Sequence, residues 1–470
     1  MKSRGPASPE KVYALMRAAG KALMLTGGNN THSGNFAVRD TTDRGLFYVT
    51  ASGAQLGALT PADVVPLRFS GVSWGDARAS TESTIHRRIL AVPGAEAVIH
   101  AHLPEAIMVT FDTPDHQNYL LHLEGENKDS EHLFVPVDWT GSRVLGRIPS
   151  GVYREPVGSL EMEKRIPEYL KNHQLTLVKG HGPFVRGKNL QECLHLTGVL
   201  GAAAVLLVTA RLRGVDTPLL SRKIHQKGAS SLYPQAVHSF CLDEMGKYQT
   251  EDISTISVFK ERGQFNFYQK ISPYGTGSMS EKITEKEMLY CPSASFPQGF
   301  EPAVARISLK PEPEDDWDLS LHKTIYRETN NKTCIRTFSP LASAEAMAVV
   351  AENFGMKALL QPDDVSIDYS HHRDHPVIKP IDAEAVYLNP RLGLCNSNAP
   401  LSAILDMLRW HKGACLIAGL GALGVGKVTL EQAAHHVSSA EFIARYRQAV
   451  SLTQKILQGP PVSHFEPETQ

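Results

Sequence analysis

Three histidines in the N-terminal half have the side-chain type and the spacing to bind a metal ion. His100 and His102 are separated by one residue, and His181 lies between two glycines. Residues i and i+2 of an extended strand point to the same face, so the first two imidazoles can reach one ion while His181 completes the ligand set. Three imidazoles leave coordination positions open for a substrate. The sequence therefore predicts an open divalent metal site, at which the ion acts as a Lewis acid.

Hydrophobic periodicity predicts the elements that must position these side chains. The expected helices are 9–25, 80–90 and 189–213, and the expected strands are 36–38, 46–50, 95–102 and 175–178. The strand 95–102 ends in the paired histidines, and the strand 175–178 leads to His181. All three ligands are therefore expected at strand ends.

The length and charge of the chain narrow the classes of function. A chain of 470 residues is longer than one hydrophobic core usually supports, so we expect two domains. The net charge is -1 and no long basic block occurs, which argues against nucleic acid or an anionic membrane surface as a partner. The expected partners are small molecules and further copies of the chain.

The apolar runs and the cysteines are those of a cytoplasmic protein. The first residues lack the apolar core of a signal peptide, and the longest apolar run, 198–208, is too short and too rich in Ala and Gly to span a bilayer. We interpret this run as a buried helix. The six cysteines form no CxxC pair, which favours reduced core thiols over a disulfide framework or a zinc ribbon.

Three segments of the second half repeat segments of the first half in the same order. Residues 318–325 resemble 82–89, residues 333–340 resemble 97–104, and residues 419–427 resemble 180–188. Every expected metal ligand is replaced in the second copy. Arg336 corresponds to His100, Phe338 to His102 and Leu420 to His181. This pattern predicts one metal site and one structural partner domain.

Two nucleotide-binding patterns and one histidine cluster are interpreted as coincidental. Residues 419–424 match GxGxxG and residues 421–427 match GxxxxGK, but Val428 replaces the Ser or Thr that a P-loop needs, and a long helical pattern follows over 430–457 instead of a second parallel strand. The cluster 371–375 contains three histidines and an aspartate in a polar stretch without apolar framing. We expect it to be a solvated turn.

The first half resembles the class II aldolase/adducin family, whose members include fuculose-phosphate and rhamnulose-phosphate aldolases and ribulose-phosphate 4-epimerase. The resemblance covers roughly 8–213, with a degenerate copy over about 236–458, judged by the order of the repeated segments. It implies zinc ligands at His100, His102 and His181. It also implies an acid/base carboxylate at Glu82, because Ser80-Thr81-Glu82 matches the family's Ser-Ser-Glu pattern.

The resemblance further implies an anion site for a substrate phosphate. The matching positions are Asn35, Ser52, Gly53, Ser80 and Thr81. Hydroxyls, an amide and backbone N–H groups at a glycine turn can donate hydrogen bonds to a phosphate without a bulky side chain in the way. Ala37 stands where a serine is expected, so one such donor is missing.

We therefore expect an α/β protein of two homologous three-layer α/β/α domains, each with a central, mainly antiparallel sheet flanked by helices. The expected boundaries are 1–215 for a catalytic domain, 216–235 for a linker and 236–470 for a degenerate domain without metal ligands. Members of the family act from interfaces in a four-domain ring, so the resemblance implies a homo-oligomer in which two tandem chains build that ring.

The implied activity is that of a metal-dependent aldolase, which breaks or forms a C–C bond in a small phosphorylated hydroxy-carbonyl compound through a metal-stabilised enediolate. Decarboxylation of a 3-oxo sugar-acid phosphate and 4-epimerisation of a pentulose phosphate remain alternatives, as does a non-catalytic, adducin-like scaffold. Zinc is the expected ion, and manganese, cobalt and iron also suit imidazole ligands. Family aldolases use a tyrosine as proton donor, for which Tyr119 and Tyr153 are candidates. The segment 111–156 differs from the corresponding aldolase segment.

Overall fold

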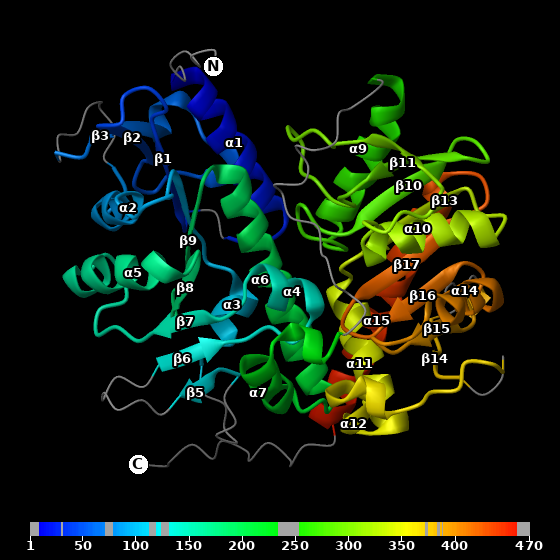
Figure 1. Cartoon of the computed structure of the whole chain (residues 1–470). Helices are drawn as coiled ribbons and strands as arrows, with labels where there is room; N and C mark the ends of the chain where they lie inside the picture. The colour runs from blue at the N-terminus through cyan, green and yellow to red at the C-terminus, as the bar shows by residue number, and fades with distance from the viewer. Residues whose placement is uncertain are drawn as a thin grey trace, which may run out of the picture.

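A computed structural model describes the chain over 9–29, 32–70, 79–111, 119–123, 131–233, 253–371, 375–382, 386–387 and 389–457. It contains two β-sheets, one in each half of the chain, with helices between and outside them (Figure 1). This arrangement confirms the prediction of two α/β domains, each with one central sheet flanked by helices.

The first sheet has the strand order β3-β2-β1-β4-β9-β8-β7-β6-β5. Its strands are β1 (Asn35–Arg39), β2 (Leu46–Thr50), β3 (Val64–Arg68), β4 (Ala97–His100), β5 (Leu121–Leu123), β6 (Glu131–Phe134), β7 (Ile148–Gly151), β8 (Leu175–Val178) and β9 (Gly182–Gly187). Its helices are α1 (Pro9–Leu25), α2 (Ser83–Leu90), α3 (Pro104–Met108), α4 (Trp139–Val144), α5 (Leu160–Asn172), α6 (Leu190–Leu212) and α7 (Thr217–Lys227).

The second sheet repeats this order as β12-β11-β10-β13-β17-β16-β15-β14. Its strands are β10 (Ser278–Lys282), β11 (Glu287–Cys291), β12 (Ala305–Ser308), β13 (Thr333–Thr337), β14 (Val377–Ile378), β15 (Leu392–Cys395), β16 (Ala414–Ile417) and β17 (Gly421–Gly426). Its main helices are α9 (Ile253–Tyr268), α10 (Trp317–Glu328), α11 (Pro340–Phe354), α12 (Met356–Leu360), α14 (Leu401–Trp410) and α15 (Leu430–Leu457). Within the described residues, the parallel pairs are β7 with β8 and β15 with β16, so both sheets are mainly antiparallel.

The strand registers align the two halves residue by residue. In the first sheet Asn35 pairs with His100, which pairs on its other side with Phe184. In the second sheet Ser278 pairs with Arg336, which pairs with Leu423. Arg336 therefore occupies the place of His100, as the sequence repeat predicts.

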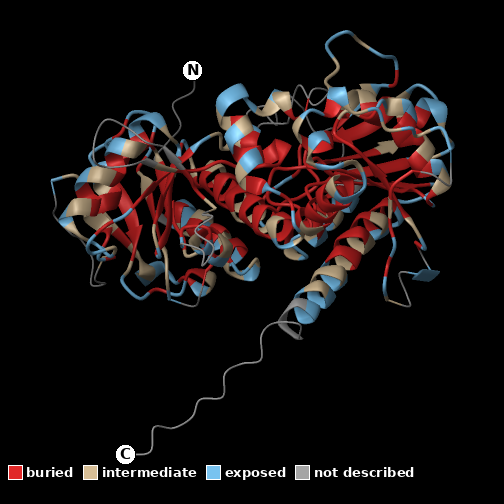
Figure 2. Cartoon of the chain, turned by 90° about the horizontal axis from the view of Figure 1, so that it is seen from below, coloured by how far each residue is buried: buried red, intermediate tan, exposed pale blue. Residues whose placement is uncertain are grey.

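Each sheet alternates its side chains between two hydrophobic layers. In β4, Val98 belongs to the cluster under α2 and α5, whereas Ala97 and Ile99 belong to the cluster on the opposite face. This second cluster continues through α6 into α11 and α15 of the other half, and Figure 2 shows these central helices as largely buried. The two halves thus share one hydrophobic core.

Three further expectations about the chain can be compared with the fold. The predicted linker 216–235 contains α7 and a 3-10 turn that ends at Ser231, with Leu220 and Ile224 buried in the shared core, and its residues 234 and 235 lie outside the described residues. The apolar run 198–208 lies in α6, which among the described residues is the helix long and apolar enough to cross a membrane, and 78% of that apolar window is buried inside the fold. Five cysteines are free and buried, as expected, and Cys241 lies outside the described residues.

In the second half, a buried ion pair occupies the position that corresponds to the expected metal site of the first half. The Arg336 guanidinium donates to the carboxylate of Asp318, the counterpart of Glu82, and the Tyr290 hydroxyl donates to the same carboxylate at 2.8 Å. Burial opposes ionisation of Asp318, but the adjacent guanidinium prevails and lowers its pKa to about 2. This carboxylate therefore has its own cation inside the fold.

We predict that Arg336→Met destabilises the protein by about 3–5 kcal/mol, because it leaves a buried carboxylate without a counter-charge. Urea denaturation measures the loss. Arg409→Met is the matched control, since Arg409 pairs with Asp406 at the surface, 3.1 Å away, and should cost less than about 1 kcal/mol. The double variant Asp318→Asn/Arg336→Met should recover part of the loss. A cost for Arg336→Met no larger than the control would contradict the prediction.

Candidate metal centre

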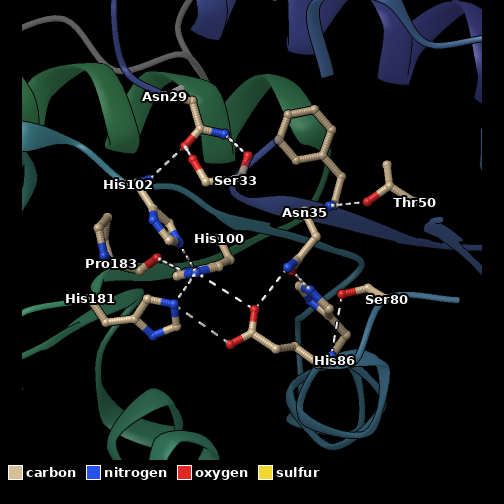
Figure 3. A network of polar contacts seen from close by, with 12 residues as sticks. Asn29, Ser33, Asn35, Thr50, Ser80, His86, His100, His102, His181 and Pro183 are labelled. Carbon is tan, nitrogen blue, oxygen red and sulfur yellow. Dashed lines mark hydrogen bonds and ion pairs between the residues drawn. The ribbon is translucent and has the colours of Figure 1, made fainter. Parts of the chain in front are cut away.

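The three expected ligands converge at one end of the first sheet. His100 Nε2 lies 3.0 Å from His102 Nε2 and 3.2 Å from His181 Nε2, and one nitrogen from each ring falls within 4.8 Å of the others. Figure 3 shows the three imidazoles pointing toward one another from different segments. No other group of three such side chains was found among the described residues. The spacing is that of ligands able to share one ion.

His100 and His102 reach this point by different means. His100 is the last residue of β4, and its Nδ1 lies 2.9 Å from the Pro183 carbonyl, so the N–H on Nδ1 leaves the Nε2 lone pair free. The expectation that His102 also lies in the strand is wrong, because β4 ends two residues earlier. The Asn29 side-chain carbonyl instead accepts from the His102 backbone N–H at 2.9 Å.

The glycines beside His181 have separate structural reasons. Gly180 has φ +71°, which suits the tight turn between β8 and β9. At Gly182 a Cβ atom would lie 2.2 Å from the Ala101 carbonyl oxygen. Only a glycine lets β9 approach the segment that carries His102 so closely.

Glu82 is buried against the histidines, with 3% of its surface exposed. It precedes α2, which packs on the face of the sheet to which His100 points. Its Oε2 lies 3.6 Å from His100 Nε2, and its Oε1 lies 4.0 Å from His181 Nε2. Asn35 donates to Oε2 at 2.8 Å, while Oε1 has no hydrogen-bond partner among the described residues. One carboxylate oxygen is thus held and the other is free to move a proton.

His86 also belongs to this network. It lies one turn after Glu82 on α2, is fully buried, and its Nε2 contacts the Asn35 side-chain carbonyl (Figure 3). Asn35 therefore links His86 to the carboxylate. The four-residue spacing from Glu82 was the available sequence signal, since residues i and i+4 share a helix face. No comparable signal marked Asn29.

Burial keeps the imidazoles uncharged. Desolvation lowers the pKa of His86 and of His100 to about 3, and for His100 the neighbouring His102 adds to the effect. Desolvation, followed by repulsion from His100, lowers the pKa of His181 to about 4. The pKa of His102 is also lowered by burial. At neutral pH these rings carry lone pairs, which is the form that binds a metal.

The residues present fit a divalent ion. Three neutral imidazoles offer their Nε2 atoms to one point, and the adjoining Glu82 carboxylate has a buried oxygen without a donor. His100 stacks on Phe184 with ring centroids 4.1 Å apart, which fixes its ring plane. Imidazole nitrogen ligands suit zinc and its neighbours in the first transition row.

The expected anion-binding residues lie on two adjacent turns and on β1. The Ser80 N–H donates to the Thr50 carbonyl at 3.1 Å, and Ala51 forms a β-bridge with Ala79, so the turn with Ser52 and Gly53 lies beside Ser80 and Thr81. Gly53 has φ +73° and nothing within 4 Å of its Cβ position, which leaves its backbone accessible. Asn35 is engaged with Glu82 instead.

Neither tyrosine candidate contacts the histidines among the contacts described. The Tyr153 ring is buried in the core under α5, with the Arg165 guanidinium 4.9 Å from its centroid. The Tyr119 ring lies under Arg211 of α6 at 4.7 Å. In the described contacts, neither of these two tyrosines thus places its hydroxyl beside the three histidines.

The structure also explains the nucleotide-binding patterns and the histidine cluster that the sequence contains. The glycine-rich segment 421–426 is the strand β17, antiparallel to β13 and β16, so it is neither a P-loop nor a dinucleotide turn. Within 371–375, residues 372–374 lie outside the described residues, and the expectation of a solvated turn is wrong for His375. This ring is buried, stacks on Trp410 and lies 2.6 Å from His411 Nε2, because α14 ends directly beneath it.

Comparison with known proteins agrees with the site. Residues 14–208 match the sequence profile of the Class II Aldolase and Adducin N-terminal domain. This match supports the resemblance of the N-terminal half to the class II aldolase and adducin family.

Individual relatives cover the same half. The Methylthioribulose-1-phosphate dehydratase of Alcanivorax borkumensis is 23% identical over 226 residues, which are 44% of this chain and 99% of the relative. The dehydratase of the same name from Microcystis aeruginosa is 28% identical over 38% of this chain and 85% of the relative. The crystal structure of l-fuculose-1-phosphate aldolase from Thermus thermophilus is 29% identical over 43% of this chain and 94% of its own, with a TM-score of 0.36.

We predict that the purified, chelator-treated protein binds one Zn²⁺ per chain, and that His181→Ala weakens binding by at least about 100-fold, beyond the roughly 10–100-fold effect of losing an outer-shell partner. Competition with a chromophoric chelator measures the affinity, and the ion should also raise the melting temperature. His173→Ala, outside the site on the same half, is the control. Equal affinity of His181→Ala and His173→Ala would rule out this ligand set.

Proposed function

We propose that the N-terminal half is a metal-dependent lyase that cleaves or forms a C–C bond in a small phosphorylated hydroxy-carbonyl compound. The observation that carries the proposal is the buried Glu82 carboxylate, which has one oxygen held by Asn35 and the other free beside three converging imidazoles. A site of this composition supports the removal or delivery of a proton at a carbon next to a carbonyl.

The metal and the carboxylate have separate tasks in this proposal. A divalent ion held by His100, His102 and His181, zinc foremost and manganese, cobalt or iron as alternatives, would supply Lewis-acid stabilisation of the enediolate. As the C–C bond breaks, the hydroxyl that becomes the aldehyde carbonyl loses its proton to water, and Glu82 Oε1 delivers a proton to the carbon from which the aldehyde has separated. Both proton transfers reverse in the synthetic direction. Asn35, positioned by His86, keeps Oε2 out of this exchange.

The substrate's phosphate is assigned to the two adjacent turns. Backbone N–H groups near Gly53 and the hydroxyls of Ser52, Ser80 and Thr81 provide uncharged donors there. Thr81 is exposed, whereas Ser80 is buried. The Ser80 hydroxyl accepts a hydrogen bond from the Glu82 backbone N–H at 3.3 Å. The turn that binds the phosphate is therefore continuous with the turn that positions the acid/base group.

Dehydration of a sugar phosphate is a second candidate. The relatives named Methylthioribulose-1-phosphate dehydratase favour dehydration. An exposed apolar side chain near the site also favours it. Phe111, which is 51% exposed, lies 3.7 Å from the Cβ position of Gly180, next to His181. In this reaction Glu82 takes the proton from the carbon beside the carbonyl and gives it to the hydroxyl on the next carbon as that C–O bond breaks, so the hydroxyl leaves as water.

We predict that the zinc-loaded protein turns over a ketose 1-phosphate and that Glu82→Gln lowers kcat by at least about 100-fold with the metal content unchanged, since general acid–base catalysis contributes about 10²–10⁴-fold. A panel of ketose and sugar-acid phosphates, followed by mass spectrometry, identifies the reaction. Dihydroxyacetone phosphate with an aldehyde indicates aldol cleavage, and an intact carbon chain lighter by water indicates dehydration. Carbon dioxide indicates decarboxylation, and an isomer of unchanged mass indicates epimerisation.

The control for this experiment is Glu163→Gln, a buried carboxylate on α5 that pairs with Arg88 away from the histidines. It should retain turnover. Loss of the ion in Glu82→Gln would assign Glu82 to metal binding instead. No turnover of any substrate by the metal-loaded protein would support the adducin-like scaffold.

We also propose that two chains assemble so that the second half of one covers the site of the other. Within the chain, the turn at Gly419, the counterpart of Gly180, is already covered by the first half: its carbonyl accepts from the Trp139 N–H at 3.0 Å, and Tyr233 packs on it. Beside the site, the Cβ position of Gly158 lies 3.6 Å from the Thr81 carbonyl oxygen, and the nearby residues Val157 and Leu160 are 64% and 74% exposed. These apolar side chains support a contact surface.

We predict a dimer, or a multiple of it, by size-exclusion chromatography with light scattering. Leu160→Asp, which places a charge on this surface, should shift the protein to the monomer and reduce turnover. Leu219→Asp on α7, at a partly exposed site of the same half, is the control. A monomeric wild-type protein with full activity would refute the assembly.

A further inference from the structure

A cavity of about 280 Å³ lies between the two halves, away from the open side of the metal centre. From the first half it is walled by the end of α1, the start of α3 and the middle of α6, and from the second half by the end of α9, the start of α11 and the middle of α15. Six apolar side chains form much of its lining: Leu23, Leu103, Val205, Phe267, Pro340 and Leu341. The interior is therefore suited to an apolar ligand.

Small residues on α6 keep the cavity open. Gly198, Gly201 and Ala202 face it in succession. A Cβ atom at Gly201 would touch only the Leu103 side chain, at 3.7 and 4.0 Å, so the backbone there does not require glycine. An empty apolar cavity destabilises a fold in proportion to its volume. Side chains that would fill the space are sterically possible here but are not used.

Two cations stand at the mouth of the cavity. Lys270 follows α9 with φ +59°, a left-handed conformation that its first-half counterpart Gly27 also adopts with φ +71°. Its Nζ lies 3.0 Å from the Cβ position of Gly27, so it crosses from one half to the other. No carboxylate lies within ion-pair distance of Lys270 in the described part of the chain. The strained lysine is thus held at the mouth with its charge unpaired.

The mouth also holds two carboxylates, which equal the two cations in number, but neither forms an ion pair with Lys270 in the described part of the chain. Arg445 is exposed and lies 4.9 Å above the Phe442 ring. Glu441 is buried and accepts from the backbone N–H groups of Leu341 and Ala342 at 3.1 and 3.0 Å. Glu105 is the one further carboxylate in the lining. An anionic head group can reach Lys270 and Arg445 while an apolar tail enters the cavity.

We propose that this cavity binds a small amphiphilic anion, a straight-chain carboxylate of roughly eight to ten carbons, given that a cavity of roughly 150 Å³ accommodates benzene. The carboxylate pairs with Lys270 and Arg445, and the chain lies between α6 and Phe267. The site is separate from the proposed substrate site. It nevertheless shares a wall with it, because Gly28 and Leu103 are the neighbours of Asn29 and His102, which are joined by a hydrogen bond of 2.9 Å.

Isothermal titration calorimetry of the full-length protein with carboxylates from butanoate to dodecanoate tests the proposal. Each added methylene should tighten binding by about four-fold until the cavity is full, after which affinity should fall. The alcohol of the best chain length should bind at least about ten-fold more weakly, and the amine more weakly still. Absence of saturable binding up to millimolar concentrations, or a preference for the amine, would overturn the proposal.

Variants locate the site. Gly201→Leu should abolish binding and raise the melting temperature, because its side chain fills the cavity. Val205→Phe, on the same helix, serves if the first variant does not fold. Lys270→Gln should weaken the carboxylate by about ten-fold without affecting the alcohol. Lys412→Gln is the matched control, since Lys412 is an exposed lysine at φ +54° outside the cavity. Binding that survives both cavity-filling variants would show that the ligand lies elsewhere.

Discussion

The structure depends on how each half neutralises a carboxylate buried at the end of its sheet. A buried charge is tolerated only when an opposite charge and hydrogen bonds compensate for lost hydration. In the second half the Arg336 guanidinium pairs with Asp318 inside the fold. In the first half, Glu82 faces three imidazoles that burial keeps neutral, and among the described residues it has no lysine or arginine partner. A bound cation would do for Glu82 what Arg336 does for Asp318.

The same backbone serves both solutions. In each half a glycine of positive φ, Gly180 or Gly419, starts the turn before β9 or β17. A second glycine, Gly182 or Gly421, lies against a backbone carbonyl of the neighbouring segment. The backbone N–H two residues after His100 bonds to Asn29, and the equivalent N–H of Phe338 bonds to the Ser272 hydroxyl at 3.1 Å. The second half therefore retains the backbone conformation of the site, but its side chains fill the corresponding position with a packed core. Its turn at Leu420 then becomes part of the contact between the halves.

Much of this organisation could be predicted from the sequence. The helices 9–25 and 430–457, the strand 175–178 and the correspondence of Arg336 with His100 follow from hydrophobic period and repeat order, both of which are local properties of the chain. Features that depend on a distant segment could not be predicted in this way. Residues 216–231 are rich in polar residues, yet they are helical because two apolar side chains reach the shared core. His375 is buried because Trp410 and His411 cover it from 35 or more residues away in the chain.

For the candidate site, too, some features could be predicted from the sequence and others depend on contacts between distant residues. Sequence alone predicted its chemistry, because the types and spacing of His100, His102 and His181 indicate nitrogen ligands and the family resemblance implies a proton carrier at Glu82. Only the tertiary structure decided its geometry. The convergence of three imidazoles, the burial that keeps them neutral, and the positioning of Glu82 through Asn35 and His86 come from contacts between residues about 50 to 80 positions apart. Such contacts leave no periodic trace in the chain, since they depend on which strands pair and which helix packs on which face.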